Sequence, residues 1–176
     1  ISRFLPSIGN YIYGTSDKAL WVNLFIGNTT EVTIDGKKVV MKQETDYPWD
    51  GLVKLTVTSE QPLGKELRIR IPGWCKSYTL SVNGNKVDST TDKGYTVIKE
   101  WKTGDLIVLN MDMPVEKVSA DPRVRQNTGK RALQRGPLVY CLEETDNAKD
   151  FADLALTPTS SFEVKDEPDN LGGIRS

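Results

Sequence analysis

From Ala19 onward, apolar residues alternate with polar residues at a period of two, and short turn-forming sequences interrupt them. β-Branched and aromatic residues dominate these runs, a pattern typical of an antiparallel β-sandwich or barrel. The pattern predicts strands near 19–26, 30–35, 38–44, 52–58, 66–71, 78–83, 95–99 and 105–111. We therefore expect a mainly β fold: an antiparallel, jelly-roll-like β-sandwich over 14–119.

Two dipeptides between these runs predict tight hairpin turns. Asp35-Gly36 and Asn83-Gly84 suit type I′ turns, in which both central residues need a positive φ. Thr103-Gly104-Asp105 predicts a further turn before the last run.

The first residues follow a different period, which predicts a short N-terminal helix over 1–13. The apolar residues that share one helical face are Ile1, Phe4, Leu5, Ile8 and Ile12. Pro6 is tolerated if the helix begins at Ser2, because first-turn amides have no intrahelical acceptor. Gly14 is a suitable stop.

The sequence changes character after Pro114. Residues 120–136 contain few large apolar side chains and predict a connecting loop; their basic residues are Arg123, Arg125, Lys130, Arg131 and Arg135. Beyond them we expect a strand near 138–142, a short helix near 148–154 and a strand near 161–164. Residues 120–176 therefore either add strands to the sandwich or begin a second, incomplete one, with a frayed tail from Lys165.

Composition narrows the function. The length of 176 residues fits one domain, or one domain with part of a second. The chain carries 23 basic and 24 acidic side chains. A formal charge of −1 offers no basic surplus for a phosphate backbone, so we expect no nucleic-acid partner. The longest apolar stretch, 19–26, is far shorter than the ~20 residues that cross a bilayer, so we expect no membrane partner.

The chain contains no histidine. Ser-His-Asp and Cys-His nucleophiles and most catalytic zinc sites therefore cannot be built from it alone. Carboxylate chemistry remains, with Asp46, Asp50, Glu100, Asp105 and Asp112 as candidates. Nothing in their spacing separates them from ordinary turn and surface residues.

The two cysteines, Cys75 and Cys141, have flanks that favour buried structural thiols. A disulfide between them and a nucleophilic thiolate are the alternatives. Zinc held by this pair alone would lack two of its four ligands.

Four tryptophans raise the possibility of carbohydrate binding, because planar aromatic rings stack on sugars. Trp21 alternates with its strand neighbours and is expected in the core. Trp49, Trp74 and Trp101 lie beside turns. In such positions their rings can either stack on a sugar or pack at the end of the sandwich.

An ordered series of segments resembles the C-terminal part of glycoside hydrolase family 127, whose characterised members are β-L-arabinofuranosidases. The segments are ISRFLPSIGNYIYG, LWVNLFIGN, YPWDG, LRIRIPGWC, VNG, GYTVIKEWKTGD, LNMDMPV and RGPLVYCLE, which together run from Ile1 to about Glu144. In that family an (α/α)6 barrel carries a zinc-bound cysteine nucleophile, and β-sandwich domains follow it.

The resemblance implies that this chain begins just after the catalytic Cys-Cys motif and that 1–13 is the remnant of the barrel's last helix. It implies no catalytic residue, metal site or cofactor here, with zinc in the catalytic domain. Expected partners are that upstream barrel, an oligosaccharide, and a second copy in a homodimer. Localisation stays open between bacterial periplasm and cytoplasm. The alternative function is a carbohydrate-binding module that uses the three turn-associated tryptophans.

Overall fold

The structure is a computed structural model that describes residues 4–60, 63–142, 154–157, 159–167 and 174–175. The chain divides into two compact units, Ile1–Asp112 and Met113–Ser176.

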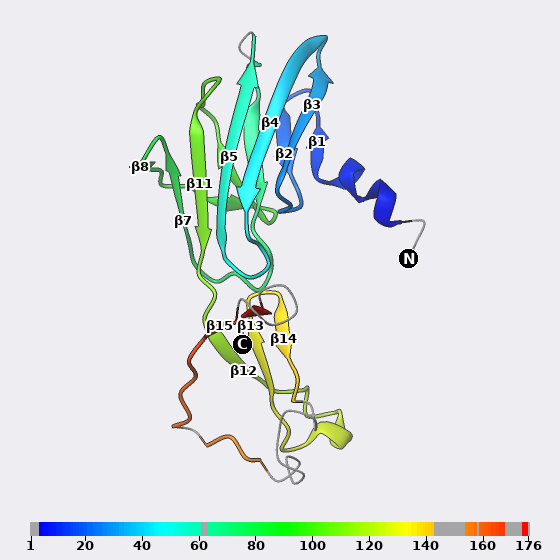
Figure 1. Ribbon diagram of the computed structural model, residues 1–176, viewed down its shortest axis with the longest axis vertical. Coiled ribbons are helices and arrows are strands. Elements are labelled where there is room, and N and C mark those ends of the chain that lie inside the picture. The colour runs from blue at the N-terminus through cyan, green and yellow to red at the C-terminus, as the bar shows by residue number, and fades with distance from the viewer. Residues whose placement is uncertain (1–3, 61–62, 143–153, 158, 168–173, 176) are drawn as a thin grey trace. The chain divides into compact units, whose positions relative to one another are not determined.

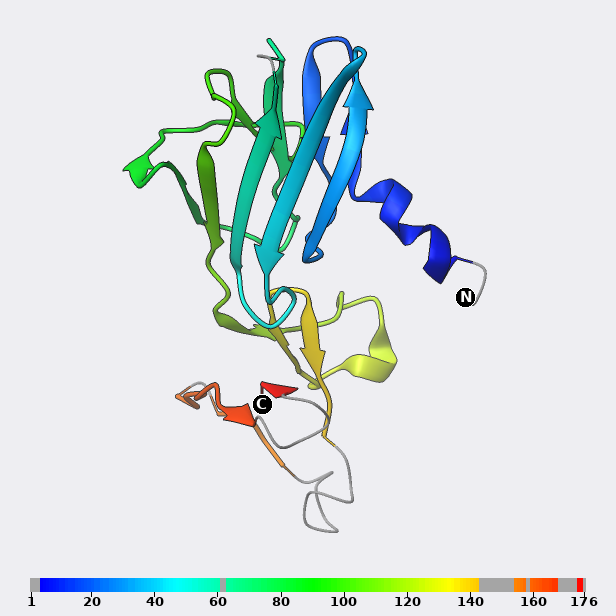
Figure 2. The same cartoon turned by 45° about the horizontal axis from the view of Figure 1, so that its top comes forward.

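Two sheets form the first unit, and they stack face to face (Figures 1 and 2). The five-stranded sheet has the order β1 (Tyr13–Thr15), β2 (Ala19–Val22), β6 (Glu66–Arg70), β10 (Tyr95–Ile98), β9 (Thr91–Asp92). The six-stranded sheet has the order β3 (Asn28–Ile34), β4 (Lys37–Thr45), β5 (Leu52–Ser59), β11 (Leu106–Met111), β7 (Tyr78–Val82), β8 (Asn85–Lys86). Neighbouring strands are antiparallel except β2 and β6, which are parallel. The predicted β-sandwich is confirmed.

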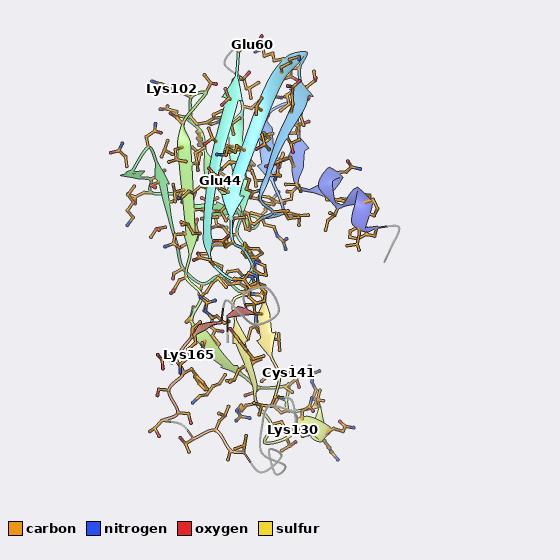
Figure 3. The ribbon with its side chains drawn as sticks, in the orientation of Figure 1. Glu44, Glu60, Lys102, Lys130, Cys141 and Lys165 are labelled. Atoms are coloured by element: carbon orange, nitrogen blue, oxygen red, sulfur yellow. The ribbon has the colours of Figure 1, made fainter. Side chains whose placement is uncertain are left out.

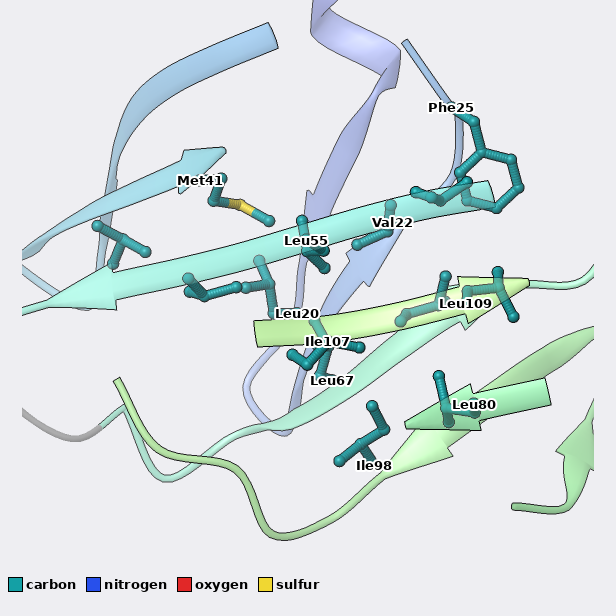
Figure 4. Close-up of a cluster of buried hydrophobic side chains, with 14 of the residues drawn as sticks. Leu20, Val22, Phe25, Met41, Leu55, Leu67, Leu80, Ile98, Ile107 and Leu109 are labelled. Atoms are coloured by element: carbon teal, nitrogen blue, oxygen red, sulfur yellow. The ribbon is translucent and has the colours of Figure 1, made fainter. Parts of the chain in front are cut away.

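The core lies between these sheets and follows the period of two. In β5, for example, Val53, Leu55 and Val57 are buried while Lys54 and Thr58 are exposed. Figure 4 shows side chains from both sheets that meet in this layer, among them Leu20, Val22, Met41, Leu55, Leu67, Leu80, Ile98, Ile107 and Leu109. The opposite surface of the six-stranded sheet carries charged side chains such as Glu44, labelled in Figure 3.

The predicted hairpin turns are confirmed by their backbone angles. Asp35 and Gly36 have φ of 52° and 74°, and Asn83 and Gly84 have φ of 50° and 81°. A third turn of this kind joins β9 to β10 at Lys93-Gly94, with φ of 49° and 83°. Its sequence does not predict this turn, because lysine is an uncommon residue at positive φ.

The N-terminal segment differs from the predicted helix over 1–13. A 3₁₀ helix, η1 (Leu5–Tyr11), has Pro6 in its first turn, and the chain then enters β1 at Tyr13. Gly14 therefore lies in a strand and does not end the helix. In Figures 1 and 2, η1 projects beside β1 and β3 away from the sheets.

The second unit holds an antiparallel sheet with the order β12 (Val115–Val118), β13 (Ala132–Arg135), β14 (Leu138–Tyr140). It also holds a 3₁₀ turn, η2 (Arg125–Asn127), and a separate pair of short strands, β15 (Asp166–Glu167) and β16 (Ile174–Arg175). The unit begins before the expected position at 119/120, because β12 pairs with β13. Between β12 and β14, β13 is paired on both sides, so the loop predicted over 120–136 is wrong for its last residues.

Two further predictions concern the C-terminal part. The strand predicted near 161–164 is wrong, since those residues have no regular structure. The helix predicted near 148–154 lies almost entirely outside the described residues. Whether this unit is an incomplete sandwich stays a prediction.

Candidate functional site

Three aromatic rings gather at one end of the sandwich, where β2, β4 and β6 each end. Phe25 meets Tyr47 edge to face, with ring centroids 5.4 Å apart, and Tyr47 stacks on Trp74 at 6.4 Å and 18°. All three pack on the core or belong to it. Burial raises the pKa of Tyr47, against the opposing influence of the Trp74 side chain and the charge of Arg70.

The predicted tryptophans do not converge on one surface. Trp74 follows the end of β6 and Trp101 follows the end of β10; these strands are antiparallel, so the two indoles lie at opposite ends of the sheet. Both pack against the core, and the Trp101 indole N–H donates to the Lys65 carbonyl at 2.8 Å. Trp49 is half-buried in the loop after β4. Their role as sugar platforms stays a prediction.

Trp21 is not in the core, so its predicted placement is wrong. Leu20 and Val22 point inward from β2, and Trp21 lies on the other face of the sheet. There it meets the Tyr95 ring edge-on at 4.8 Å, and the Arg68 guanidinium lies 5.0 Å from its centroid. A strand residue between two inward-facing neighbours must face outward, and this one is covered by the long side chains beside it.

Several of the candidate carboxylates are bound into turns. Asp50 accepts the Leu52 amide at 2.6 Å, and Asp112 pairs with the Ser77 hydroxyl at 3.2 Å. Asp105 accepts the Lys102 amide and the Asn83 side-chain amide, each at 2.7 Å. Asp46 and Glu100 are exposed. This is the turn and surface role expected from the sequence.

Asp105 gives a testable pH dependence. The hydrogen bond from the Lys102 amide, then that from Asn83, lower the pKa of its carboxyl. The charged form therefore stabilises the fold above the ordinary carboxyl pKa of about 3.9, and this contribution is lost as the pH falls through the lower folded pKa. We expect Asp105→Asn to destabilise the chain at pH 7 and much less at the acid end. Urea unfolding at several pH values measures the difference, and a constant difference would contradict the expectation.

The cysteines are separate and differ from the expected buried pair. Cys75 is half-buried, its Sγ 3.1 Å from the Ser77 carbonyl, and burial raises the pKa of its thiol. Cys141, labelled in Figure 3, is exposed. Both thiols are free in the structure, and because they belong to separate units the disulfide alternative stays a prediction. Among the described residues no cluster of His, Cys, Asp or Glu is able to hold a metal ion, and no helix is long and apolar enough to span a membrane.

An open groove lies at the edge of the sandwich where the chain crosses from β8 to β9. It encloses about 410 Å³ and is lined from β7 and from the segment 86–91. The Tyr78 hydroxyl in this groove hydrogen-bonds with Ser89 Oγ at 3.3 Å and Thr91 Oγ1 at 3.0 Å. These residues are not among the predicted site residues, although the run of three hydroxyl residues from Ser89 to Thr91 is visible in the sequence.

Family models divide the chain in the same two parts as its fold. Residues 19–113 match the middle domain of the GH127 β-L-arabinofuranosidases, and residues 115–168 match the family's C-terminal domain. The chain belongs to glycoside hydrolase family 127.

Three relatives of this family 127 chain are longer proteins, and the chain matches each of them over less than a third of its length. A non-reducing end β-L-arabinofuranosidase of Bifidobacterium longum subsp. longum is 36% identical over 99% of this chain and 28% of its own length. The crystal structure of a GH127 β-L-arabinofuranosidase from Geobacillus stearothermophilus T6 superposes with a TM-score of 0.92 at 47% identity, over 98% of this chain and 28% of that one. A GH127 β-arabinofuranosidase structure gives a TM-score of 0.92 at 36% identity, over 99% and 30%.

Proposed function

We propose that this chain is a non-catalytic β-sandwich part of a β-L-arabinofuranosidase, which supports a helical catalytic barrel in the same protein. The observation that carries the proposal is the match of both units to the family's middle and C-terminal domains. The chain spans about 28% of the curated relative that it matches, so most of such an enzyme lies in other residues.

The chemistry of this chain supports a non-catalytic role. The residues do not fit the cysteine-rich zinc site expected in the catalytic domain, because the chain has only two cysteines and the described residues contain no cluster of metal ligands. Asp50, Asp105 and Asp112 are engaged in turn contacts. We therefore derive no reaction step from the residues of this chain.

A contact with further protein is supported by the apolar surface of η1. Phe4, Leu5 and Tyr11 are exposed by 52%, 59% and 55% of their surface, and the rings of Phe4 and Tyr11 lie 5.8 Å apart. Large apolar side chains gathered on one exposed element are typical of a surface that another part of the protein covers. We assign that role to the helical barrel.

Turnover of a chromogenic β-L-arabinofuranoside by the purified 176-residue chain tests the proposal. We expect no product above the blank, while the full-length Geobacillus stearothermophilus enzyme in the same assay gives product. Turnover that copurifies with the chain through two successive separations would overturn it.

The supporting role has a separate test. Replacing Phe4, Leu5 and Tyr11 by serine should leave the unfolding of the isolated chain unchanged, because these side chains are exposed in it. In the full-length protein that carries this chain, the same substitutions should lower the melting temperature. An unchanged melting temperature there would contradict the contact.

A further inference from the structure

We propose that the groove between β7 and the 86–91 segment binds a neutral oligosaccharide. The groove lies on the side of the sandwich where β8 and β9 form the last strands of their sheets, and the rings of Tyr47 and Trp74 do not line it. In Figure 1, β7 and β8 mark this side.

The size of the groove suits a small ligand. Its volume of about 410 Å³ falls within the roughly 300–1,000 Å³ of small-molecule sites in proteins. The segment 87–90 crosses between the two sheets here, and the Val87 amide donates to the Leu80 carbonyl at 2.9 Å. That bond attaches the start of the crossing to β7, so one wall of the groove is held in place before a ligand arrives.

Hydroxyl groups are the main polar feature of the groove. The bonds from Tyr78 to Ser89 and Thr91 join β7 of one sheet to the strand β9 of the other. Next to them Thr96 is fully buried, and among the described residues its Oγ1 has no partner with hydrogen-bond geometry. Each hydroxyl is both a donor and an acceptor, as are the hydroxyls of a sugar.

The electrostatics of Tyr78 agree with this arrangement. Burial alone raises the pKa of its phenol, but the hydrogen bonds with Ser89 and Thr91 outweigh it and lower the pKa below the ordinary value. Either oxygen can be the donor in each of these two bonds, so Tyr78 can keep its own proton for a further acceptor. It is therefore a suitable group to bind a sugar hydroxyl.

Apolar surface and rim charges select the class of sugar. The partly buried Val87 side chain gives the groove apolar surface, which suits the C–H face of a pyranose or furanose ring. Lys76, Lys86 and Asp88 stand at the rim and carry both signs of charge. Asp112, which hydrogen-bonds with a serine that lines the groove, adds a second carboxylate, so the two signs of charge balance and the rim favours neutral sugars.

Titration of the ¹⁵N-labelled 176-residue chain tests the proposal, with two probes at up to tens of millimolar. A β-L-arabinofuranosyl disaccharide is chosen on the basis of the proposed function, and maltose is a neutral sugar that does not depend on it. We expect saturable shifts of the amides of 76–91 with at least one probe. Binding of maltose alone would support the groove and count against arabinofuranosyl recognition by it, so the two proposals fail separately.

Three variants separate binding from folding. Tyr78→Phe removes the hydroxyl and keeps the ring, and we expect it to weaken binding at least fivefold. Lys86→Ala changes only an exposed rim residue, so it tests the same groove if the first variant does not fold; we expect binding to weaken. The matched control is Tyr95→Phe, which removes a hydroxyl bonded to Asn23 at 2.9 Å on the five-stranded sheet and should leave binding unchanged.

Two results would overturn the proposal. One is the absence of saturable shifts with both probes in the wild-type chain. The other is binding that Tyr78→Phe and Lys86→Ala leave intact, which would place the sugar elsewhere, for example at Trp49, Trp74 or Trp101.

Discussion

Lys65→Met is expected to lower the free energy of unfolding of the sandwich by about 3 kcal/mol, because hydrogen bonds from a charged group each contribute roughly 1.5–3 kcal/mol. The Lys65 side chain is only 3% exposed, and its ammonium lies 2.9 Å from Asp35 Oδ2. It also donates to the Ser16 carbonyl at 2.6 Å and the Asp17 carbonyl at 3.0 Å. One buried cation thus joins the β1–β2 turn to the β3–β4 turn.

Methionine keeps the apolar stem of Lys65 and removes the charge, so the two carbonyl groups lose a donor. Urea unfolding followed by tryptophan fluorescence measures the effect. The control is Lys18→Met, an exposed lysine in the turn before β2, which should stay within about 0.5 kcal/mol of wild type. Hydrogen bonds to charged groups contribute roughly 1.5–3 kcal/mol each. If Lys65→Met lowers the free energy of unfolding by less than about 1 kcal/mol, the contacts of Lys65 contribute little and the expectation is contradicted.

Gly51→Ala is expected to destabilise the sandwich by about 3 kcal/mol, at the upper end of the range for overpacked sites. Gly51 is buried immediately before β5, and its carbonyl accepts the Met111 amide of β11 at 3.0 Å. A Cβ at this position would overlap the Met111 carbonyl oxygen. The obstacle is backbone inside a paired sheet, so no rotamer change relieves it.

Gly73→Ala is the matched control for this substitution. Gly73 lies in the exposed loop after β6, and a Cβ there has no neighbour within 4 Å. The same chemical change should therefore be nearly neutral at position 73. Equal effects of the two variants in thermal unfolding would contradict the assignment of the loss to the contact between β5 and β11.

The long strands were predictable because their burial repeats every second residue. β4, β5 and β11 each bury alternate side chains between the sheets, and the predicted ranges overlap them closely. Short strands were missed for the same reason: β8 and β9 hold two residues each, too few for a period to show. The groove depends on these two strands, so its hydroxyl cluster could not be assembled from sequence.

Pairing with neighbouring strands makes β13 a strand, although the pattern of apolar and polar residues did not predict one there. β13 carries the basic and polar residues of a loop, yet it pairs with β12 and β14 on its two sides. The resemblance to family 127, in contrast, was carried by ordered segments of sequence and did not need the sheets.

By itself, therefore, the sequence determined a β-sandwich, two of its type I′ turns and the lack of a histidine-based site, because these depend on local alternation, local backbone preference and composition. Only the tertiary structure decided that Trp21 faces outward, that Trp74 and Trp101 lie at opposite ends of one sheet, and that Tyr78 meets Ser89 and Thr91. The physical reason is that strand order and direction bring together residues far apart in the chain, and no local pattern encodes that order.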